Sequence, residues 1–236
     1  MADFAQHGVI GTLHNLRHRS TEELEAELLR HAPETPMSLV LPCLYSELEG
    51  DALTGIVDKL AKVPYLEEII IGLDAADREQ FERARDFFSK LPQRHSILWN
   101  DGPRLLEIDR RLTTENLSPL ERGKGRNVWY CLGYFLASAR SKVVALHDCD
   151  ILTYERDMPA RLFYPLVHPD MDYVFCKGYY YRAAQGRLNG RVFRLLVTPL
   201  IQALQKTTGN NEYLAYMGSF RYALSGEFSM RSEVVT

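Results

Sequence analysis

The chain has 236 residues, of which 46% are hydrophobic and 25% charged, a balance typical of a folded globular protein rather than a disordered one. This length suits one sizeable α/β domain. The formal charge of -3 excludes a global attraction to nucleic acid or to an acidic membrane surface, so we expect neither as a partner.

The predicted elements alternate between strand and helix. Residues 1–19 are polar and predict a loose arm, and a capping box at Ser20 and Glu23 starts a first helix. Apolar runs predict strands at 37–44, where Pro42 is expected to stop the strand, and at 68–73, 96–99, 143–146 and 173–177. Apolar residues at helical spacing predict helices at 51–62, 78–90, 128–139 and 192–205. The pattern predicts an α/β fold with a mainly parallel sheet flanked by helices, in a single domain of residues 20–236.

The four cysteines lie far apart in the sequence, and none forms a Cys-x-x-Cys pair: Cys43, Cys131, Cys149 and Cys176. We expect buried free thiols in a reducing compartment, and neither a zinc site nor a disulfide framework. No apolar run reaches membrane-spanning length, and the first residues lack the apolar core of a signal peptide. The sequence therefore predicts a cytoplasmic protein without a membrane partner.

Two aspartates follow the strand predicted at 143–146, in the segment Asp148-Cys149-Asp150. A strand that ends in this way holds carboxylates at the carboxyl edge of a sheet, where open α/β folds bind ligands. Strand alternation would point the two side chains to opposite faces, but a turn at Asp148 would bring both to one hydrated Mg2+ or Mn2+ ion. By itself the pattern favours a solvated acidic turn over a metal site, and the other motifs reverse that preference.

A second motif, Gly123-Lys124-Gly125, opens the predicted helix that contains Trp129. Glycines let a backbone approach phosphate closely, a helix N-terminus favours anions, and Lys124 adds positive charge. The spacing is not that of a Walker loop, and a flexible basic turn is the alternative. Because this helix leads into the strand before Asp148, a phosphate grip and the metal carboxylates would share one sheet edge.

The first two strands also end in candidate ligands. Pro42 and Leu44 end the first strand, with Glu47 close behind, and Asp74 ends the second. Such strand ends suit a nucleotide base or ribose, although each is also an ordinary strand-terminating turn.

Two later segments complete the set of candidates. The segment Asn189-Gly190-Arg191-Val192 precedes a helix, where backbone N–H groups and Arg191 suit a phosphate or carboxylate, or form a simple cap. Glu227 follows a glycine turn and could equally be an ordinary acid at a helix N-terminus.

Together these motifs resemble retaining nucleotide-sugar glycosyltransferases of the GT-A type. The likeness is greatest to glucosyl-3-phosphoglycerate synthases and their relatives that make mannosylglycerate or glucosylglycerate. It covers residues 38–235, where six short motifs follow the family's order: Pro42-x-Leu44, Asp74, Gly123-Lys124-Gly125 with Trp129, Asp148-Cys149-Asp150, Asn189 to Val192 before Pro199-Leu200, and Leu224 to Phe228.

The resemblance implies a Rossmann-like GT-A fold and a hexosyltransferase. The donor would be a nucleoside diphosphate sugar of the UDP-glucose or GDP-mannose type, and the acceptor a small acid such as glycerate or 3-phosphoglycerate. Transfer would be retaining and dependent on Mg2+ or Mn2+. The oligomeric state stays open, and a homodimer is allowed.

The family's residue roles carry over to matching positions. They imply nucleotide-sugar binding by Pro42, Leu44, Glu47, Asp74, Lys124 and Asp148; a divalent metal on Asp150 and Asp148; acceptor binding by Gly190, Arg191 and Val192; and a catalytic role beside the transferred sugar for Glu227.

Three departures from the family pattern qualify these roles. Tyr45-Ser46-Glu47 stands where the family has Asn-Glu-Glu, and Phe193 stands where phosphoglycerate enzymes usually place a threonine that helps to hold the acceptor. The sequence stops nine residues after Glu227, before a segment that in relatives carries a histidine metal ligand. We therefore expect a C-terminally truncated form that binds a nucleotide but turns over a nucleotide sugar slowly or not at all.

Two other classes of protein remain as alternatives. A sugar nucleotidyltransferase also uses a lysine in a glycine-rich turn and an aspartate-bound metal. Its glycine-rich signature usually lies on the first strand-to-helix turn, and here that turn holds only Gly50, which disfavours it. The second alternative is a non-catalytic nucleotide-binding remnant.

Overall fold

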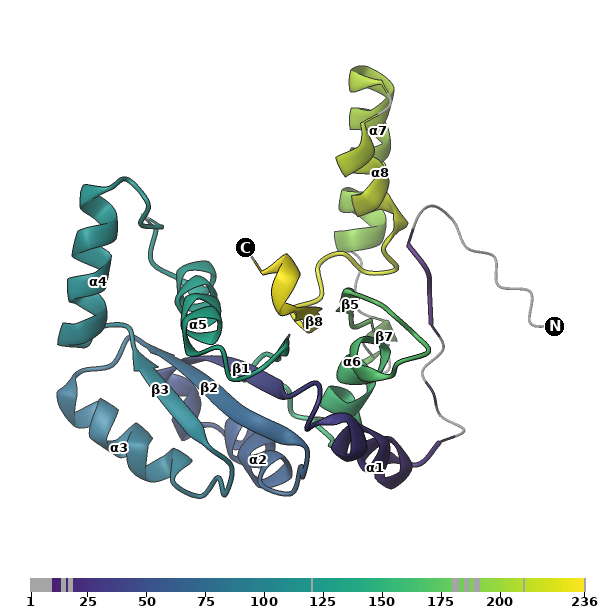
Figure 1. Cartoon of the computed structure of the whole chain (residues 1–236). Helices are drawn as coiled ribbons and strands as arrows, with labels where there is room; N and C mark the ends of the chain where they lie inside the picture. Colours follow the sequence, from purple (N-terminus) through teal and green to yellow (C-terminus); the bar gives the residue numbers. More distant parts are fainter. Residues whose placement is uncertain are drawn as a thin grey trace. The chain divides into compact units, whose positions relative to one another are not determined.

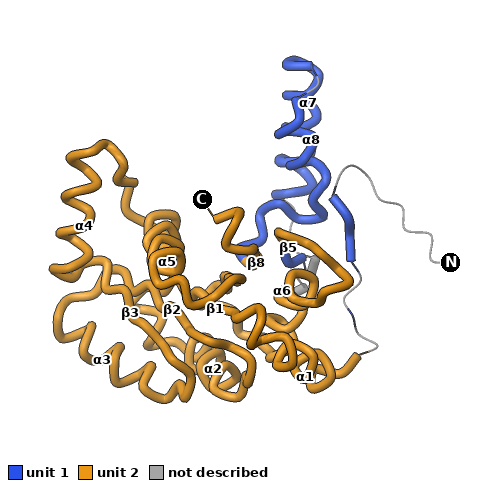
Figure 2. Tube along the Cα trace, viewed as in Figure 1, with its two compact units in different colours: residues 1–18, 177–226 blue, residues 19–176, 227–236 orange. Residues whose placement is uncertain are grey.

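The computed structural model describes residues 10–13, 16, 19–119, 121–179, 183–184, 187–188, 192–209 and 211–235. The chain divides into two compact units, coloured separately in Figure 2. The small unit comprises Met1–His18 and Lys177–Gly226, and the large unit comprises Arg19–Cys176 and Glu227–Thr236. That residues 20–236 act as one domain after a loose arm of 1–19 stays a prediction.

A six-stranded sheet forms the centre of the fold (Figure 1). Its strands, in spatial order, are β3 (His95–Trp99), β2 (Leu66–Asp74), β1 (Met37–Leu44), β4 (Val143–Leu146), β8 (Phe228–Arg231) and β5 (Phe175–Lys177). The first four of these run parallel to one another, and β8 runs antiparallel to β4. The predicted mainly parallel sheet is therefore confirmed, and the strand predicted at 143–146 is central, between β1 and β8.

The described helices of the large unit are α1 (Thr21–His31), α2 (Asp51–Leu60), α3 (Arg78–Phe88), α4 (Pro103–Thr114), α5 (Lys124–Ser138) and α6 (Asp157–Val167). Of these, α2 to α5 connect the parallel strands, α1 precedes β1 and α6 follows β4. The capping box predicted at Ser20 and Glu23 starts α1. The sequence reading missed α4 and α6. Helix α4 carries Leu105, Ile108 and Leu112 at helical spacing, although none of its residues is buried.

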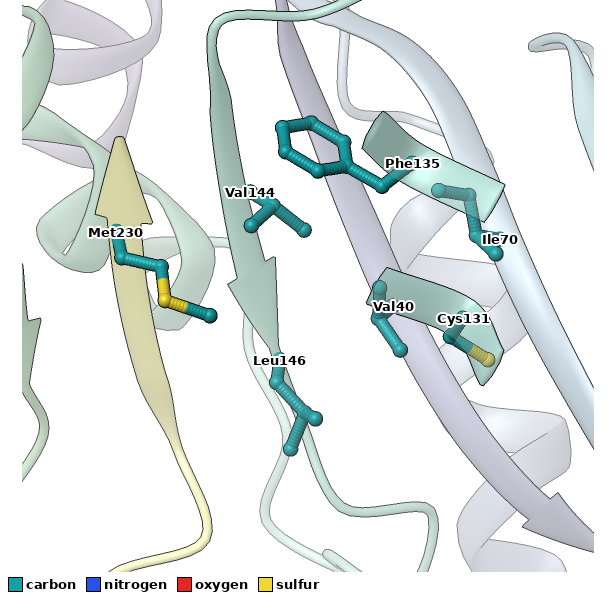
Figure 3. Packing of buried hydrophobic residues seen from close by; sticks show 7 residues of the cluster. All are labelled: Val40, Ile70, Cys131, Phe135, Val144, Leu146 and Met230. Atoms are coloured by element: carbon teal, nitrogen blue, oxygen red, sulfur yellow. The ribbon is translucent and has the colours of Figure 1, made fainter. Parts of the chain in front are cut away.

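Helix α5 packs on one face of the sheet through a cluster of buried side chains (Figure 3). Cys131 and Phe135 of α5 lie against residues of four strands: Val40, Ile70, Val144, Leu146 and Met230. The intervening residues of β1 and β2 are also buried. Strands buried on both faces read as continuous apolar runs, which is why these strands were found from the sequence.

Pro42 does not end β1, contrary to the prediction, since the strand continues to Leu44. The carbonyl of Val40 accepts a hydrogen bond from the backbone N–H of His147, so even-numbered residues of β1 turn their backbone groups toward β4. The pairing of β4 with β1 stops at Val40. Pro42 has no backbone N–H, but an N–H at this position would point past the last residue of β4 that pairs with β1. The proline therefore removes no hydrogen bond between the two strands.

The small unit contains the hairpin of β6 (Ala183–Ala184) and β7 (Arg187–Leu188) and two helices, α7 (Thr198–Thr208) and α8 (Glu212–Ser219). A π-helical segment, Phe193–Val197, leads into α7, so the helix predicted at 192–205 is confirmed with a changed first turn. The sequence reading missed α8. Within the described part of the chain, no helix combines the length and apolar character needed to cross a membrane.

Candidate functional site

The direction in which the sheet grows reverses between β1 and β4. From β1 the chain adds β2 and β3 on one side, and then returns to place β4 on the other. Open α/β sheets bind ligands outside the carboxyl ends of their strands at such a switch point. Strand β4 pairs with β1 only as far as Leu146 and Val40, whereas β1 pairs with β2 as far as Leu44 and Asp74. The last residues of β1 therefore border an edge that β4 leaves open.

The chain turns at Cys149 and Asp150, immediately beyond β4. Exposure alternates along this segment: His147 is buried, Asp148 is half-buried, Cys149 is buried and Asp150 is exposed. The turn and the alternation together hold the carboxylate of Asp150 at the surface and that of Asp148 partly inside the edge.

Lys124 lies at this same edge because it opens α5. Gly123, the residue before it, has a φ of 143°, in the region that favours glycine. The Lys124 ammonium forms an ion pair with the Asp148 carboxylate. The first turn of α5 carries no acidic residue, so its backbone N–H groups keep a positive potential at this end. Lys124 and the two aspartates therefore meet at one edge, as the order of the motifs predicted.

Glu47 fixes the loop that follows β1. Its carboxylate accepts a hydrogen bond of 2.7 Å from the backbone N–H of Leu44, which itself is exposed. Burial raises the pKa of Glu47, and the nearby charge of Asp150 raises it further, while the Leu44 N–H and the charge of Lys124 lower it. Glu47 is therefore within electrostatic reach of both Asp150 and Lys124.

Asp74 ends β2 directly beside Leu44 in the register of the parallel pair, and it is 7% exposed. The backbone N–H of Asn100 bonds to the carbonyl of Leu73, so β3 ends at the same level. Pro42, Leu44 and Asp74 thus line up along one edge of the sheet, as predicted.

Glu227 lies immediately before β8 and is 2% exposed. Because Phe228 pairs with Leu146, Glu227 stands beside His147 in the antiparallel register. This acid therefore belongs to the carboxyl end of β4 within the large unit. The alternative that it begins a helix is wrong, since the glycine turn leads into a strand.

The predicted acceptor residues belong to the small unit. Gly190 and Arg191 lie outside the residues that the structure describes, so nothing tests them. Val192 is 60% exposed where the π-helical segment begins. The ring of Phe193 packs against that of Tyr222, with centroids 5.4 Å apart.

Two cysteines, Cys43 and Cys149, lie close together at this edge, and the sequence did not predict that they would. The side-chain ligand atoms of Cys43, Glu47 and Cys149 lie within 4.8 Å of one another. Contact with Cys43, followed by burial, raises the pKa of the Cys149 thiol. No sequence signal marked this meeting, because it depends on the register in which Val40 pairs with Leu146, three residues before each cysteine. All four cysteines are free thiols; Cys43, Cys131 and Cys149 are buried as predicted, whereas Cys176 is half-buried.

Comparison with known proteins supports the resemblance on sequence. No protein-family model matches the chain. The glucosyl-3-phosphoglycerate synthase of Persephonella marina is 48% identical over 229 residues, which cover 97% of this chain and 57% of that protein. The enzyme of the same name from Methanococcoides burtonii is 39% identical over 203 residues, covering 84% of this chain and 49% of that protein. The chain thus spans about half the length of these curated relatives.

Solved structures of the Mycobacterium tuberculosis glucosyl-3-phosphoglycerate synthase share the fold. The complex with Mn2+, UDP and glucosyl-3-phosphoglycerate has a TM-score of 0.58 and 22% identity, over 91% of this chain and 62% of that one. The complex with Mn2+ and UDP-glucose has a TM-score of 0.58 and 21% identity, over 89% and 60%. The predicted GT-A fold and the resemblance to glucosyl-3-phosphoglycerate synthases are therefore confirmed.

Proposed function

We propose that this relative of the glucosyl-3-phosphoglycerate synthases binds a nucleoside diphosphate hexose with a divalent metal and transfers the hexose to a small phosphorylated acid. UDP-glucose and 3-phosphoglycerate are the proposed substrates, since the Mycobacterium tuberculosis enzyme binds both with Mn2+. A cytoplasmic location and a homodimer stay predictions.

One observation carries the proposal: the ends of β1 and β4 and the start of α5 converge at the switch point of the sheet. Lys124 forms an ion pair with Asp148, and the charges of Asp150 and Lys124 both shift the pKa of Glu47. Within the large unit, one edge therefore offers positive charge for a diphosphate, carboxylates for a metal and the β1 end for a base.

The donor set at Asp148 and Asp150 fits Mg2+ or Mn2+. Both are hard cations that take carboxylate oxygens and share their coordination with substrate phosphates. Asp150 is exposed at the edge, and Asp148 is half-buried beside it. Asp150 would hold the ion and Asp148 would contact the ribose or the ion. When bound, the metal supplies positive charge next to the diphosphate leaving group.

The chain's own residues would complete donor binding and transfer. The Lys124 ammonium would stabilise negative charge on the departing diphosphate, and Pro42, Leu44, Glu47 and Asp74 would seat the base and ribose. Glu227 is the proposed acid beside the transferred sugar, supported by its burial next to the end of β4. Gly190, Arg191 and Val192 would hold the acceptor. We propose retention of configuration at the anomeric carbon.

Calorimetric titration with UDP and UDP-glucose, with and without Mn2+, tests donor binding. We expect Mn2+ to strengthen UDP binding and Asp150→Ala to remove that gain, because the ion depends on this carboxylate. The matched control is Asp58→Ala, which removes an exposed aspartate from α2. If Mn2+ strengthened UDP binding equally in Asp150→Ala, the Asp pair would be only a solvated turn.

Product analysis separates the proposed transferase from its rivals. Incubation with UDP-glucose and 3-phosphoglycerate should release UDP and form glucosyl-3-phosphoglycerate. A sugar nucleotidyltransferase would instead form UDP-glucose from glucose 1-phosphate and UTP. Nucleotide binding with no product from either pair of substrates would identify a binding remnant and contradict the proposed transfer.

A further inference from the structure

The side chains of Cys43, Glu47 and Cys149 converge beneath the proposed donor site. One ligand atom from each lies within 4.8 Å of the other two. Cys43 and Glu47 lie at the end of β1 and in the loop after it, and Cys149 lies between the two aspartates. Cys43 and Cys149 are 1% and 2% exposed, while Glu47 is half-buried on the solvent side.

The convergence follows from the parallel register of β1 and β4. Val40 pairs with Leu146, and three residues farther along each strand stand Cys43 and Cys149. Alternation after β4 turns Cys149 inward and Asp150 outward. The edge therefore presents two donor sets: the carboxylate oxygens of Asp148 and Asp150 on the outer side and the sulfurs of Cys43 and Cys149 on the inner side.

We propose that Cys43, Cys149 and Glu47 form a second metal site, for a thiophilic divalent cation of the Zn2+ class. Two thiolates and a carboxylate are ligands that Zn2+ takes, whereas Mg2+ and Mn2+ prefer oxygen ligands. Three protein ligands leave the fourth tetrahedral position to a water molecule. This site differs from the donor metal site in its ligands and in its preferred ions, and it does not depend on the proposed transferase activity.

The observed geometry needs little adjustment to hold the ion. Bonds of about 2.0–2.3 Å to a tetrahedral ion set ligand atoms about 3.3–3.8 Å apart, so atoms that lie within 4.8 Å of one another must close by at most about 1.0–1.5 Å. One oxygen of Glu47 accepts the Leu44 N–H, and the Cys43 thiol also hydrogen-bonds to this carboxylate, so metal binding would replace that thiol contact with bonds to the ion. The half-buried carboxylate gives the ion its route from solvent.

Charge balances when the ion binds. Each thiol releases one proton to solvent as its sulfur bonds to the metal, so a dication replaces two protons and the net charge of the edge is unchanged. The effect of the ion is therefore to tie the end of β1 to the turn after β4. Binding only the folded state, it should also raise the unfolding temperature.

The test uses the whole chain under a phosphine reductant, with Co2+ as a coloured substitute for Zn2+. We expect one equivalent of Co2+ to produce a thiolate-to-metal charge-transfer band and the visible bands of a tetrahedral ion. Cys43→Ser and Cys149→Ser should each abolish the charge-transfer band or halve it, and Cys176→Ser, outside the cluster, should leave it unchanged. Glu47→Gln should weaken binding at least about tenfold, since losing even an outer-shell partner costs about 10–100-fold.

Two further measurements use the wild-type chain, so they test the second metal site even if a cysteine variant fails to fold. X-ray absorption of the wild-type chain with one equivalent of Zn2+ should show two sulfur neighbours. Excess Mn2+ should leave the Co2+ bands in place, because it occupies the oxygen set. A Zn2+ ion with oxygen and nitrogen neighbours only, or Co2+ bands that Mn2+ removes, would overturn the second site.

Discussion

At the scale of single residues, the segment from His147 to Asp150 places two side chains in the core and two carboxylates at the edge of the sheet. Alternation buries His147 and Cys149 and turns the carboxylates of Asp148 and Asp150 toward the edge. Burial lowers the pKa of His147 to about 3, so this imidazole is neutral inside the sheet and adds no charge beside the aspartates. The charge pattern of the edge is therefore set by Asp148, Asp150, Glu47 and Lys124.

Lys124→Gln should weaken UDP binding about tenfold. A hydrogen bond to a charged group contributes roughly 1.5–3 kcal/mol. Because solvent screens the half-exposed Lys124, we expect its contribution to lie at the lower end of this range. The loss should shrink as ionic strength rises. Calorimetry at two salt concentrations measures both effects, with Lys142→Gln, an exposed lysine before β4, as the control. Equal loss in both variants would argue against a phosphate contact.

Arg191→Ala should raise the Michaelis constant for 3-phosphoglycerate about tenfold or more and leave UDP binding unchanged. The reason is the loss of a charge-assisted contact worth roughly 1.5–3 kcal/mol to an anionic acceptor. Steady-state kinetics with each substrate varied in turn separates the two effects. The control is Arg194→Ala, an exposed arginine of the π-helical segment. A matching loss of donor binding in Arg191→Ala would instead indicate a folding role.

At the scale of elements, α5 links the core of the sheet to the proposed phosphate grip. Asn127 donates a 2.7 Å hydrogen bond to the carbonyl of Gly72 in β2, one turn beyond Lys124. Gly72 permits this close approach, because a Cβ there would lie 1.8 Å from the Asn127 side-chain oxygen and 2.6 Å from the Cys131 sulfur. The position of Lys124 therefore depends on a glycine in a neighbouring strand.

Gly72→Ala should destabilise the chain by about 1–3 kcal/mol, because it overpacks the contact between β2 and α5. It should also weaken UDP binding as α5 moves away from Asp148. Gly55→Ala is the matched control: a Cβ there meets nothing within 4 Å, and alanine in a helix interior should stabilise by about 1 kcal/mol. Urea unfolding measures both changes. An unaltered midpoint in Gly72→Ala would show that the helix can shift without cost.

At the scale of the whole molecule, the proposed donor and acceptor residues belong to different units. Pro42, Lys124, the Asp pair and Glu227 lie in the large unit, whereas 190–192 lie in the small unit. Donor binding can therefore be tested separately from any response of the helices α7 and α8.

UDP with Mn2+ should slow amide hydrogen exchange in the large unit at 44–50, in the first turn of α5 and at 147–151. Exchange in α7 and α8 should stay unchanged, because no proposed donor ligand lies there. Ligand at about 100 times its dissociation constant stabilises the folded state by about 2.7 kcal/mol, so the midpoint of urea unfolding should rise as well. Hydrogen-exchange mass spectrometry reads both units at once, and protection of α8 by UDP alone would contradict this assignment.

The sequence by itself predicted five of the six strands of the sheet and the order of the motifs at their ends, but not β8, which lies beside β4. Strands β1, β2 and β4 are buried on both faces over most of their length, so apolar runs mark them whatever their partners. The missed helices α4 and α8 have no buried residue, whereas α6, also missed, buries most of its residues. Short motifs at strand ends could be read as one site because parallel strands bring their carboxyl ends to the same edge.

Only the tertiary structure decided which side chains meet. The pairing of Lys124 with Asp148, the place of Glu227 beside His147 and the meeting of Cys43 with Cys149 each join segments more than twenty residues apart. Such contacts depend on strand order and register, and sequence periodicity specifies neither of them. Periodicity reports which face of an element is buried, whereas the neighbour that covers this face is selected when the whole sheet assembles.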